Sequence, residues 1–249
     1  MNNVCLVIPM YNEEIRFNPD IIRQYLNHNP ECGLILVDDG SLDGTKKVIK
    51  ILKQVYPSRV NTLFLPTNLG KGPAIWAAIE EFKSEILKKY EYFGYIDADL
   101  SFNPNYLQYF FAYSYKKPYH KVLIGSRLKI LGCDINRNPL RHYLGRIFAT
   151  VTSWLLDEPI YDTQCGVKVF HSDLLETLFA EKFLTKWLFD VEIFYRMKYK
   201  TENFTIQRNV IEIPLPEWKN QPKSKVNWRD FLLSPFELLT IHFHYNRYR

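Results

Sequence analysis

The sequence predicts an α/β fold, with a largely parallel sheet and helices on both of its faces. Two observations carry this prediction. Short apolar runs alternate with amphipathic stretches along the first 100 residues, and strands that are buried on both faces produce such runs. Repeated β-α units of this kind produce parallel strands joined by crossover helices. With 249 residues, 47% of them hydrophobic and 24% charged, the chain has the composition of one large or two small globular domains.

Each element follows from a local pattern. Continuous apolar runs predict strands at Val4–Pro9, Leu34–Val37, Val60–Leu65, Tyr92–Ile96 and Val122–Ile124. Helical spacing predicts helices at 23–28 after Pro19, at Gly44–Val55, at Gly72–Tyr90, from Asn103-Pro104 to about Tyr115, and at Leu140–Leu156. The last of these helices has an apolar stripe that suits a core helix and a membrane-interface helix equally well.

Composition excludes several other classes of protein. No stretch approaches the roughly 18 consecutive apolar residues of a membrane-spanning helix, and no basic segment precedes the apolar run at Val4. We therefore expect neither export nor a transmembrane anchor. The four cysteines lie far apart, which argues against a disulfide framework and favours a cytoplasmic protein.

The net charge of +5 is concentrated in two segments. Residues 116–146 hold eight lysines and arginines and one acidic residue, and residues 216–249 hold six basic residues and three acidic ones. Nucleic acid, phosphorylated small molecules and anionic lipid are all possible partners of such segments, and so is plain solvent. The chain becomes basic and aromatic after Pro214-Leu215-Pro216, which predicts a catalytic domain at 1–215 and a short helical appendage at 216–249.

Polar residues follow each of the first four predicted strands. Ligands of parallel α/β sheets bind at the carboxyl ends of the strands, so we expect these residues to line one crevice. The four segments are Pro9-Met10-Tyr11-Asn12-Glu13, Asp38-Asp39-Gly40-Ser41, Asn68-Leu69-Gly70-Lys71-Gly72 and Asp97-Ala98-Asp99.

Three of these segments suggest chemistry. Asp97 and Asp99 flank one small residue at a strand end, where both carboxylates can turn toward one Mg²⁺ or Mn²⁺ ion. The Asp38-Asp39 pair either accepts hydrogen bonds from a base or ribose, or belongs to an ordinary turn and helix cap. The glycines around Lys71 allow close backbone approach, and Lys71 can reach an anionic ligand, although the spacing of a Walker phosphate loop is missing.

These motifs, in this order and spacing, resemble the inverting GT-A glycosyltransferases of family 2. Motifs farther along the chain look like the polyprenyl-phosphate branch of that family, which includes dolichyl-phosphate β-glucosyltransferases and dolichyl-phosphate mannose synthases. They are Gly125-Ser126-Arg127, the stretch from Asp162 to Phe170, the stretch from Trp187 to Glu192, and Lys223-Ser224-Lys225-Val226.

The resemblance implies roles for individual residues. It places the nucleotide pocket at Pro9, Tyr11, Glu13, Asp38 and Asp39 with Lys71 nearby, the metal ligands at Asp97 and Asp99, and the basic residues for the donor diphosphate and the acceptor phosphate at Arg127, Arg141 and Lys225. Mannose synthases have a glutamine two residues after the acidic motif as a further metal ligand, whereas this chain has Ser101.

The resemblance also implies the substrates. The donor is a nucleotide sugar, with UDP-glucose favoured and GDP-mannose as the other candidate, and the acceptor is a polyprenyl phosphate. Because that lipid stays in its membrane, the C-terminal segment is expected to contact the cytoplasmic face peripherally, with folding back onto the catalytic domain as the alternative. A phosphate acceptor needs no strong general base. In relatives that act on hydroxyls a carboxylate in this region serves as the base, so Asp162, Asp190 and Glu192 are either bases or buried carboxylates that pair with arginine or cap a helix. Cys165 is expected to be a packing residue.

Three other functions remain open at this point. A family 2 enzyme can glycosylate a soluble sugar or glycan hydroxyl, and a protein with the same pocket can bind a nucleotide sugar without turnover. Nucleic-acid binding ranks last, because the sequence lacks the usual motifs and such a protein does not need carboxylates at strand ends.

Overall fold

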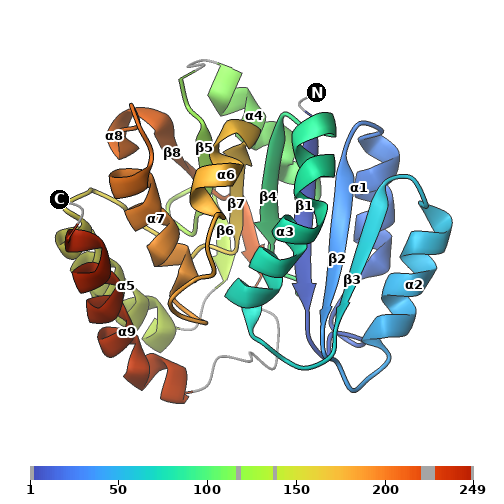
Figure 1. The fold of residues 1–249 in the computed structure, drawn as a ribbon, viewed down its shortest axis with the longest axis horizontal. Helices are drawn as coiled ribbons and strands as arrows, with labels where there is room; N and C mark the ends of the chain where they lie inside the picture. Colours follow the sequence, from blue (N-terminus) through green and yellow to red (C-terminus); the bar gives the residue numbers. More distant parts are fainter. Residues whose placement is uncertain (1–2, 116–118, 137–138, 220–227, 248–249) are drawn as a thin grey trace.

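A computed structural model describes residues 3–115, 119–136, 139–219 and 228–247. Its centre is a seven-stranded sheet in the order β3-β2-β1-β4-β7-β5-β8, with a separate two-stranded sheet of β6 and β9. Helices cover both faces of the large sheet (Figure 1). The predicted α/β fold class is confirmed.

The first half of the chain forms regular β-α units. The strands β1, β2, β3 and β4 all run parallel, because a helix carries the chain back between them. The bounds are β1 Val4–Met10, α1 Pro19–His28, β2 Gly33–Asp39, α2 Thr45–Val55, β3 Val60–Leu65, α3 Lys71–Lys89 and β4 Tyr92–Ile96. The predicted strands at 60–65 and 92–96 match these bounds, and the other predicted elements of this half differ from them at one or both ends by one to four residues.

The second half is less regular. Strand β7 runs antiparallel to both of its neighbours, β4 and β5, whereas β5 and β8 are parallel to each other. The elements are the short η1 Pro104–Tyr106, α4 Leu107–Tyr115, β5 Val122–Ser126, β6 Asp134–Asn136, α5 Pro139–Leu156, β7 Val167–His171, the short η2 Ser172–Leu174, α6 Leu175–Leu178, α7 Phe189–Lys200, α8 Ile206–Asn209, β8 Val210–Pro214, β9 Glu217–Lys219 and α9 Trp228–Asn246.

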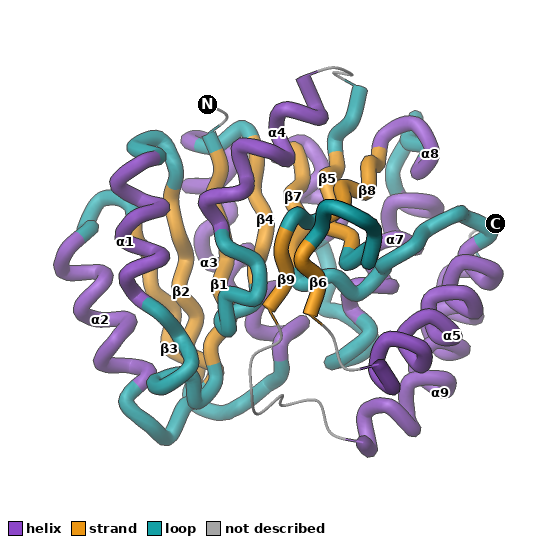
Figure 2. Tube along the Cα trace, turned by 180° about the vertical axis from the view of Figure 1, so that it is seen from behind, coloured by secondary structure: helices purple, strands orange, loops and turns teal. Residues whose placement is uncertain are grey.

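Two apolar cores lie on opposite faces of the sheet. In β1, Leu6 and Ile8 face the core under α1, α2 and α4, whereas Cys5 and Val7 face the core under α3 and α7. Figure 2 shows α1, α2 and α4 on one side of the strands. Burial on both faces explains why the central strands β1 and β4 contain no charged residue.

The C-terminal helix α9 packs against the domain along one side. Leu238, Ile241 and Tyr245 are buried in the same core as α7, and α9 lies beside α5 (Figures 1 and 2). Its other side exposes Phe236 and Phe243. The division of the chain at residues 215 and 216 stays a prediction. Among the described residues, no helix combines the length and apolar character that crossing a membrane requires.

Candidate active site

The segments after β1 and β2 are joined by hydrogen bonds at the carboxyl ends of these strands. The backbone N–H of Asn12 donates to Ser41 Oγ at 2.9 Å, and that of Glu13 donates to Thr45 Oγ1 at 2.8 Å. Asn12 adopts a φ of 49°, a region that asparagine tolerates better than most residues. Pro9 is the next-to-last residue of β1 and Tyr11 follows the strand, so both lie at this edge of the sheet.

Asp39 joins the loop after β2 to the loop after β3. Its two carboxylate oxygens accept the backbone N–H groups of Leu69 and Gly70 at 2.8 and 2.9 Å. Burial raises the pKa of Asp39, and these hydrogen bonds act in the opposite direction. Gly70 has a φ of 100°, which L side chains rarely adopt, so a glycine is required for this turn. Asp39 therefore holds the loop that precedes Lys71.

Asp38 has a different environment from its neighbour. Its side chain is fully buried, and Oδ1 accepts the backbone N–H of Ser41 at 3.3 Å. Within the described part of the chain no group donates a hydrogen bond to Oδ2, and the nearest cation is Lys46 Nζ at 3.7 Å. A buried acceptor of this kind can receive a hydrogen bond from a ligand. Of the two aspartates, Asp38 is thus the better candidate for contact with a base or ribose.

Asp97 connects the loop after β4 to the start of α3. Lys71 Nζ lies 2.7 Å from Asp97 Oδ1, and the Asp97 side chain remains 31% exposed. Gly166 passes close to the other oxygen, because a Cβ atom at this glycine would lie 1.8 Å from Asp97 Oδ2. The glycine of the Cys165-Gly166 motif is therefore needed to leave room for the carboxylate.

Asp99 completes the ring of loops. Arg16 Nη2, from the loop after β1, lies 3.1 Å from Asp99 Oδ2, and the backbone N–H of Ser101 donates to Oδ1 at 3.0 Å. Burial and the charge of Asp97 raise the pKa of Asp99. A hollow of about 350 Å³, lined in part by Arg16, Asn18 and Asp99, adjoins this carboxylate. The four predicted strand-end segments are thus brought together at one edge of the sheet.

The carboxylate oxygens at this edge of the sheet are suitable ligands for a hard divalent cation. Asp97 and Asp99 are half-buried carboxylates, and each already attracts a protein cation. No group of three or more His, Cys, Asp and Glu side chains is arranged to hold a metal ion in the described residues. Ser101 is buried and holds Asp99 through its backbone. The protein would supply two carboxylates, and donor phosphates and water would supply the remaining ligands, as is usual for Mg²⁺.

Arg127, at the end of β5, is paired with a carboxylate. Its guanidinium donates to Asp162 through Nε and Nη2 at 2.7 Å each, and its plane lies near the ring of Trp218, 5.2 Å from the ring centroid. Burial alone would lower the pKa of Arg127, but the charge of Asp162, its hydrogen bonds with Arg127 and the charge of Asp97 together raise the pKa. Lys225 lies outside the described residues, and so does the side chain of Arg141, whose backbone belongs to α5.

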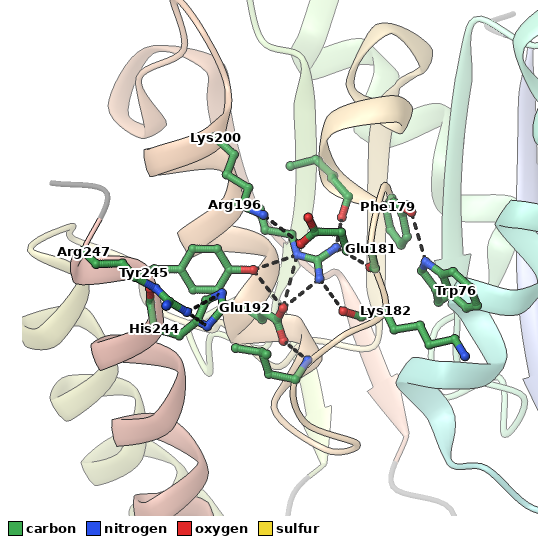
Figure 3. A network of polar contacts seen from close by, with 12 residues as sticks. Trp76, Phe179, Glu181, Lys182, Glu192, Arg196, Lys200, His244, Tyr245 and Arg247 are labelled. Carbon is green, nitrogen blue, oxygen red and sulfur yellow. Dashed lines mark hydrogen bonds and ion pairs between the residues drawn. The ribbon is translucent and has the colours of Figure 1, made fainter.

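Asp190 and Glu192, whose roles the sequence left undecided, are also paired with cations. Asp190, at the start of α7, is buried and contacts Lys168 Nζ. Glu192 is fully buried and lies 2.8 Å from Arg196 Nη2, and the hydroxyl of Tyr245 donates to it at 2.9 Å (Figure 3). Glu192 therefore joins α7 to α9 rather than facing the strand-end loops.

Sequence reasoning missed three cations that the fold brings to these carboxylates. Arg16 lies in the loop after β1, and Lys168 lies in β7. Lys186 lies beside Gly70, and its positive charge acts to lower the pKa of Asp39. Lys168 lies within the motif from Asp162 to Phe170, and a lysine among the apolar residues of this strand was the signal that could have identified it. Cys165 is buried, as predicted for a packing residue, and burial raises the pKa of its thiol to about 12.

Solved structures share this fold. The glucosyl-3-phosphoglycerate synthase of Mycobacterium tuberculosis, in complex with Mn²⁺, UDP and glucosyl-3-phosphoglycerate, superposes with a TM-score of 0.65 at 13% identity, over 98% of this chain and 80% of that one. A complex of the same enzyme with Mn²⁺, UDP-glucose and phosphoglyceric acid gives a TM-score of 0.63 at 13% identity, over 98% of this chain and 79% of that one.

This fold is the GT-A, Rossmann-like architecture, and the family model places the chain in the class of glycosyltransferases. More specifically, the chain belongs to glycosyl transferase family 2, whose family model matches residues 5–179. The resemblance seen in the sequence is confirmed.

Curated relatives include several dolichyl-phosphate beta-glucosyltransferases. The protein of that name from Trichomonas vaginalis is 28% identical over 94% of this chain, which spans 69% of the relative's length. Those from Dictyostelium discoideum and Mus musculus are each 30% identical over 77% of this chain, which spans 61% and 62% of their respective lengths.

Proposed function

We propose that this glycosyltransferase transfers a hexose, with glucose favoured, from a nucleotide sugar to a polyprenyl phosphate with the help of Mg²⁺ or Mn²⁺. UDP-glucose is the favoured donor and GDP-mannose the other candidate. The names of the curated relatives support glucose and a dolichyl phosphate acceptor. The ligands named for the solved neighbours support a uridine nucleotide and Mn²⁺.

The donor would lie across the ring of strand-end loops. Asp38 offers a buried acceptor for the nucleoside, while Asp97 and Asp99 lie at the edge where the diphosphate would bind. A divalent cation held by these two aspartates supplies electrostatic stabilisation of the charge on the departing diphosphate. Lys71 and Lys186 add positive charge to the same edge of the sheet. A single in-line displacement at the sugar inverts the anomeric centre.

The single observation that carries the choice of acceptor is the pairing of the three candidate bases. Asp162 is bound by Arg127, Asp190 by Lys168, and Glu192 by Arg196. A carboxylate neutralised by a buried cation is a poor acceptor for a proton, so none of the three suits deprotonation of a sugar hydroxyl. The oxygen of a phosphate monoester is already anionic near neutral pH. The arrangement therefore favours a phosphate acceptor over a hydroxyl.

A surface suited to a membrane lies on the two neighbouring helices α5 and α9. We call it the α5–α9 surface, and it consists of exposed apolar side chains at helical spacing on each helix. They are Tyr143, Ile147, Val151 and Trp154 on α5, and Leu233, Phe236, Leu239 and Phe243 on α9. Apolar and aromatic side chains of this kind insert at the boundary between headgroups and acyl chains. Peripheral contact with the cytoplasmic face of a membrane would bring the enzyme to its lipid acceptor.

Organic extraction tests this function. The protein is incubated with radiolabelled UDP-glucose or GDP-mannose, Mn²⁺ or Mg²⁺, and dolichyl or undecaprenyl phosphate. Label in the organic phase with one donor, dependent on the lipid phosphate, is the expected result. Label that stays in the aqueous phase with every lipid phosphate would overturn the proposal, and transfer to a soluble sugar would identify a hydroxyl acceptor instead.

A further inference from the structure

Lys71 lies between two carboxylates that belong to different elements. Its Nζ is 2.7 Å from Asp97 Oδ1, in the loop after β4, and 4.0 Å from Asp190 Oδ2, at the start of α7. The Lys71 side chain is 32% exposed, whereas Asp190 is buried. The ammonium group is thus in direct contact with Asp97 and one short movement away from Asp190.

Asp190 is fixed on the side away from Lys71. Its Oδ1 accepts the hydroxyl of Tyr95 and contacts Lys168 Nζ, and both of those side chains are fully buried. Lys168 is itself held by the backbone carbonyl of Cys165 at 3.0 Å. Because Oδ1 has these partners, Oδ2 is the oxygen that faces Lys71. The row Lys168, Asp190, Lys71, Asp97 therefore alternates in charge from the core to the site.

The path of Lys71 between its two partners is lined by aromatic rings. Its Nζ lies 5.4 Å from the ring centroid of Tyr95 and 5.3 Å from that of Phe189. Rings at this distance attract a cation through their faces. They keep the ammonium group close to both carboxylates, so that a change of partner needs only rotation of the lysine side chain.

We propose that Lys71 is an internal counterion that neutralises Asp97 in the donor-free enzyme and moves to Asp190 when a divalent cation binds Asp97. The inference rests on the proposed function, which makes Asp97 a metal ligand. A lysine and a divalent cation compete for the same carboxylate, because both need its negative charge and the close approach of its oxygens. Asp190 then acts as a positioning residue, since it receives the displaced lysine and lowers the cost of displacement.

Binding of Mn²⁺ to the nucleotide-free protein, followed by electron paramagnetic resonance, tests this competition without any turnover. Lys71→Met removes the internal competitor, and we expect Mn²⁺ to bind about tenfold more tightly, which corresponds to about 1.4 kcal/mol. Lys186→Met is the matched control, because Lys186 adds positive charge beside Gly70 and Asp39 rather than at Asp97. Lys83→Met is a remote control on the same helix with the same 32% exposure as Lys71.

Asp190→Asn tests the second half of the proposal. In this variant Lys71 has no carboxylate at position 190 to move to and stays paired with Asp97. Mn²⁺ should therefore bind the variant about three- to tenfold more weakly than it binds the wild type. In the double variant Lys71→Met, Asp190→Asn this loss should largely disappear, since no lysine needs to be received. Additive effects in this cycle would indicate general electrostatics and would contradict the assigned role of Asp190.

The remaining outcomes separate the inference from the function on which it rests. If Lys71→Met binds Mn²⁺ no more tightly than Lys186→Met does, the competition is refuted even where Asp190→Asn does not fold. If the wild type and all variants fail to bind Mn²⁺ both with and without UDP, the metal site itself is refuted, and the inference with it. Circular dichroism of each variant establishes that the comparison is made between folded proteins.

Discussion

Arg127 Nε and Nη2 each lie 2.7 Å from an oxygen of Asp162, so the two side chains form a bidentate, largely buried ion pair. This geometry joins the residue after β5 to the segment that precedes β7. Paired charges of this kind are costly to separate, because each partner left alone is poorly solvated.

Arg127→Ala is expected to destabilise the protein as well as to impair transfer. The change leaves Asp162 buried without its cation, and we expect the free energy of unfolding to fall by about 3 kcal/mol. Urea denaturation followed by circular dichroism measures it. The double variant Arg127→Ala, Asp162→Ala should recover part of the loss, and equal stability of the Arg127 variant and the wild type would show that the pair contributes little.

Asp99→Asn removes one negative charge from the candidate metal site with almost no change of shape. We expect transfer to fall by at least about a hundredfold, since stabilisation of the leaving diphosphate is a large part of catalysis. Initial rates at saturating Mn²⁺ measure the effect, and an unchanged melting temperature shows that the fold is kept. Asp173→Asn, in η2 and paired with Lys121, is a matched control. Wild-type turnover in the Asp99 variant would remove this residue from the site.

Tyr245→Phe tests how firmly α9 is held on the domain. The Tyr245 hydroxyl donates to Glu192 and accepts from Arg196 Nε at 3.1 Å, in the buried network of Figure 3. Loss of this hydroxyl should lower the free energy of unfolding by about 1 to 2 kcal/mol. Tyr119→Phe, at an exposed tyrosine, serves as the control and should be neutral. A neutral Tyr245 variant would show that the network does not anchor the helix.

The α5–α9 surface makes a prediction about vesicles. Leu233→Ser combined with Phe243→Ser removes two exposed apolar side chains from α9, and we expect binding to vesicles that contain anionic lipid to weaken about tenfold or more. Sedimentation with the vesicles measures the bound fraction. Val55→Ser combined with Leu87→Ser changes two exposed apolar residues on α2 and α3 instead and should have no effect. Equal loss in both double variants would refute a specific membrane face.

The pattern of the sequence was informative for the first half of the fold. Short apolar runs predicted strands that are buried on both faces, and β1 alternates its side chains between the two cores as expected. The convergence of four strand-end segments followed from parallel topology alone. The reversed direction of β7 was not predictable in the same way, because strand direction depends on the path of a long connection and leaves no local periodicity.

Patterns in the amino-acid sequence were enough to predict the fold class, the family, and the edge of the sheet at which Asp38, Asp97 and Asp99 gather. The cation that each carboxylate meets became known from the three-dimensional packing, because the partners come from distant segments: Arg16 for Asp99, Lys71 for Asp97, and Lys168 for Asp190. It also decided which side of α9 is buried. Periodicity reports short-range geometry, whereas ion pairs between separate elements depend on how those elements pack in three dimensions.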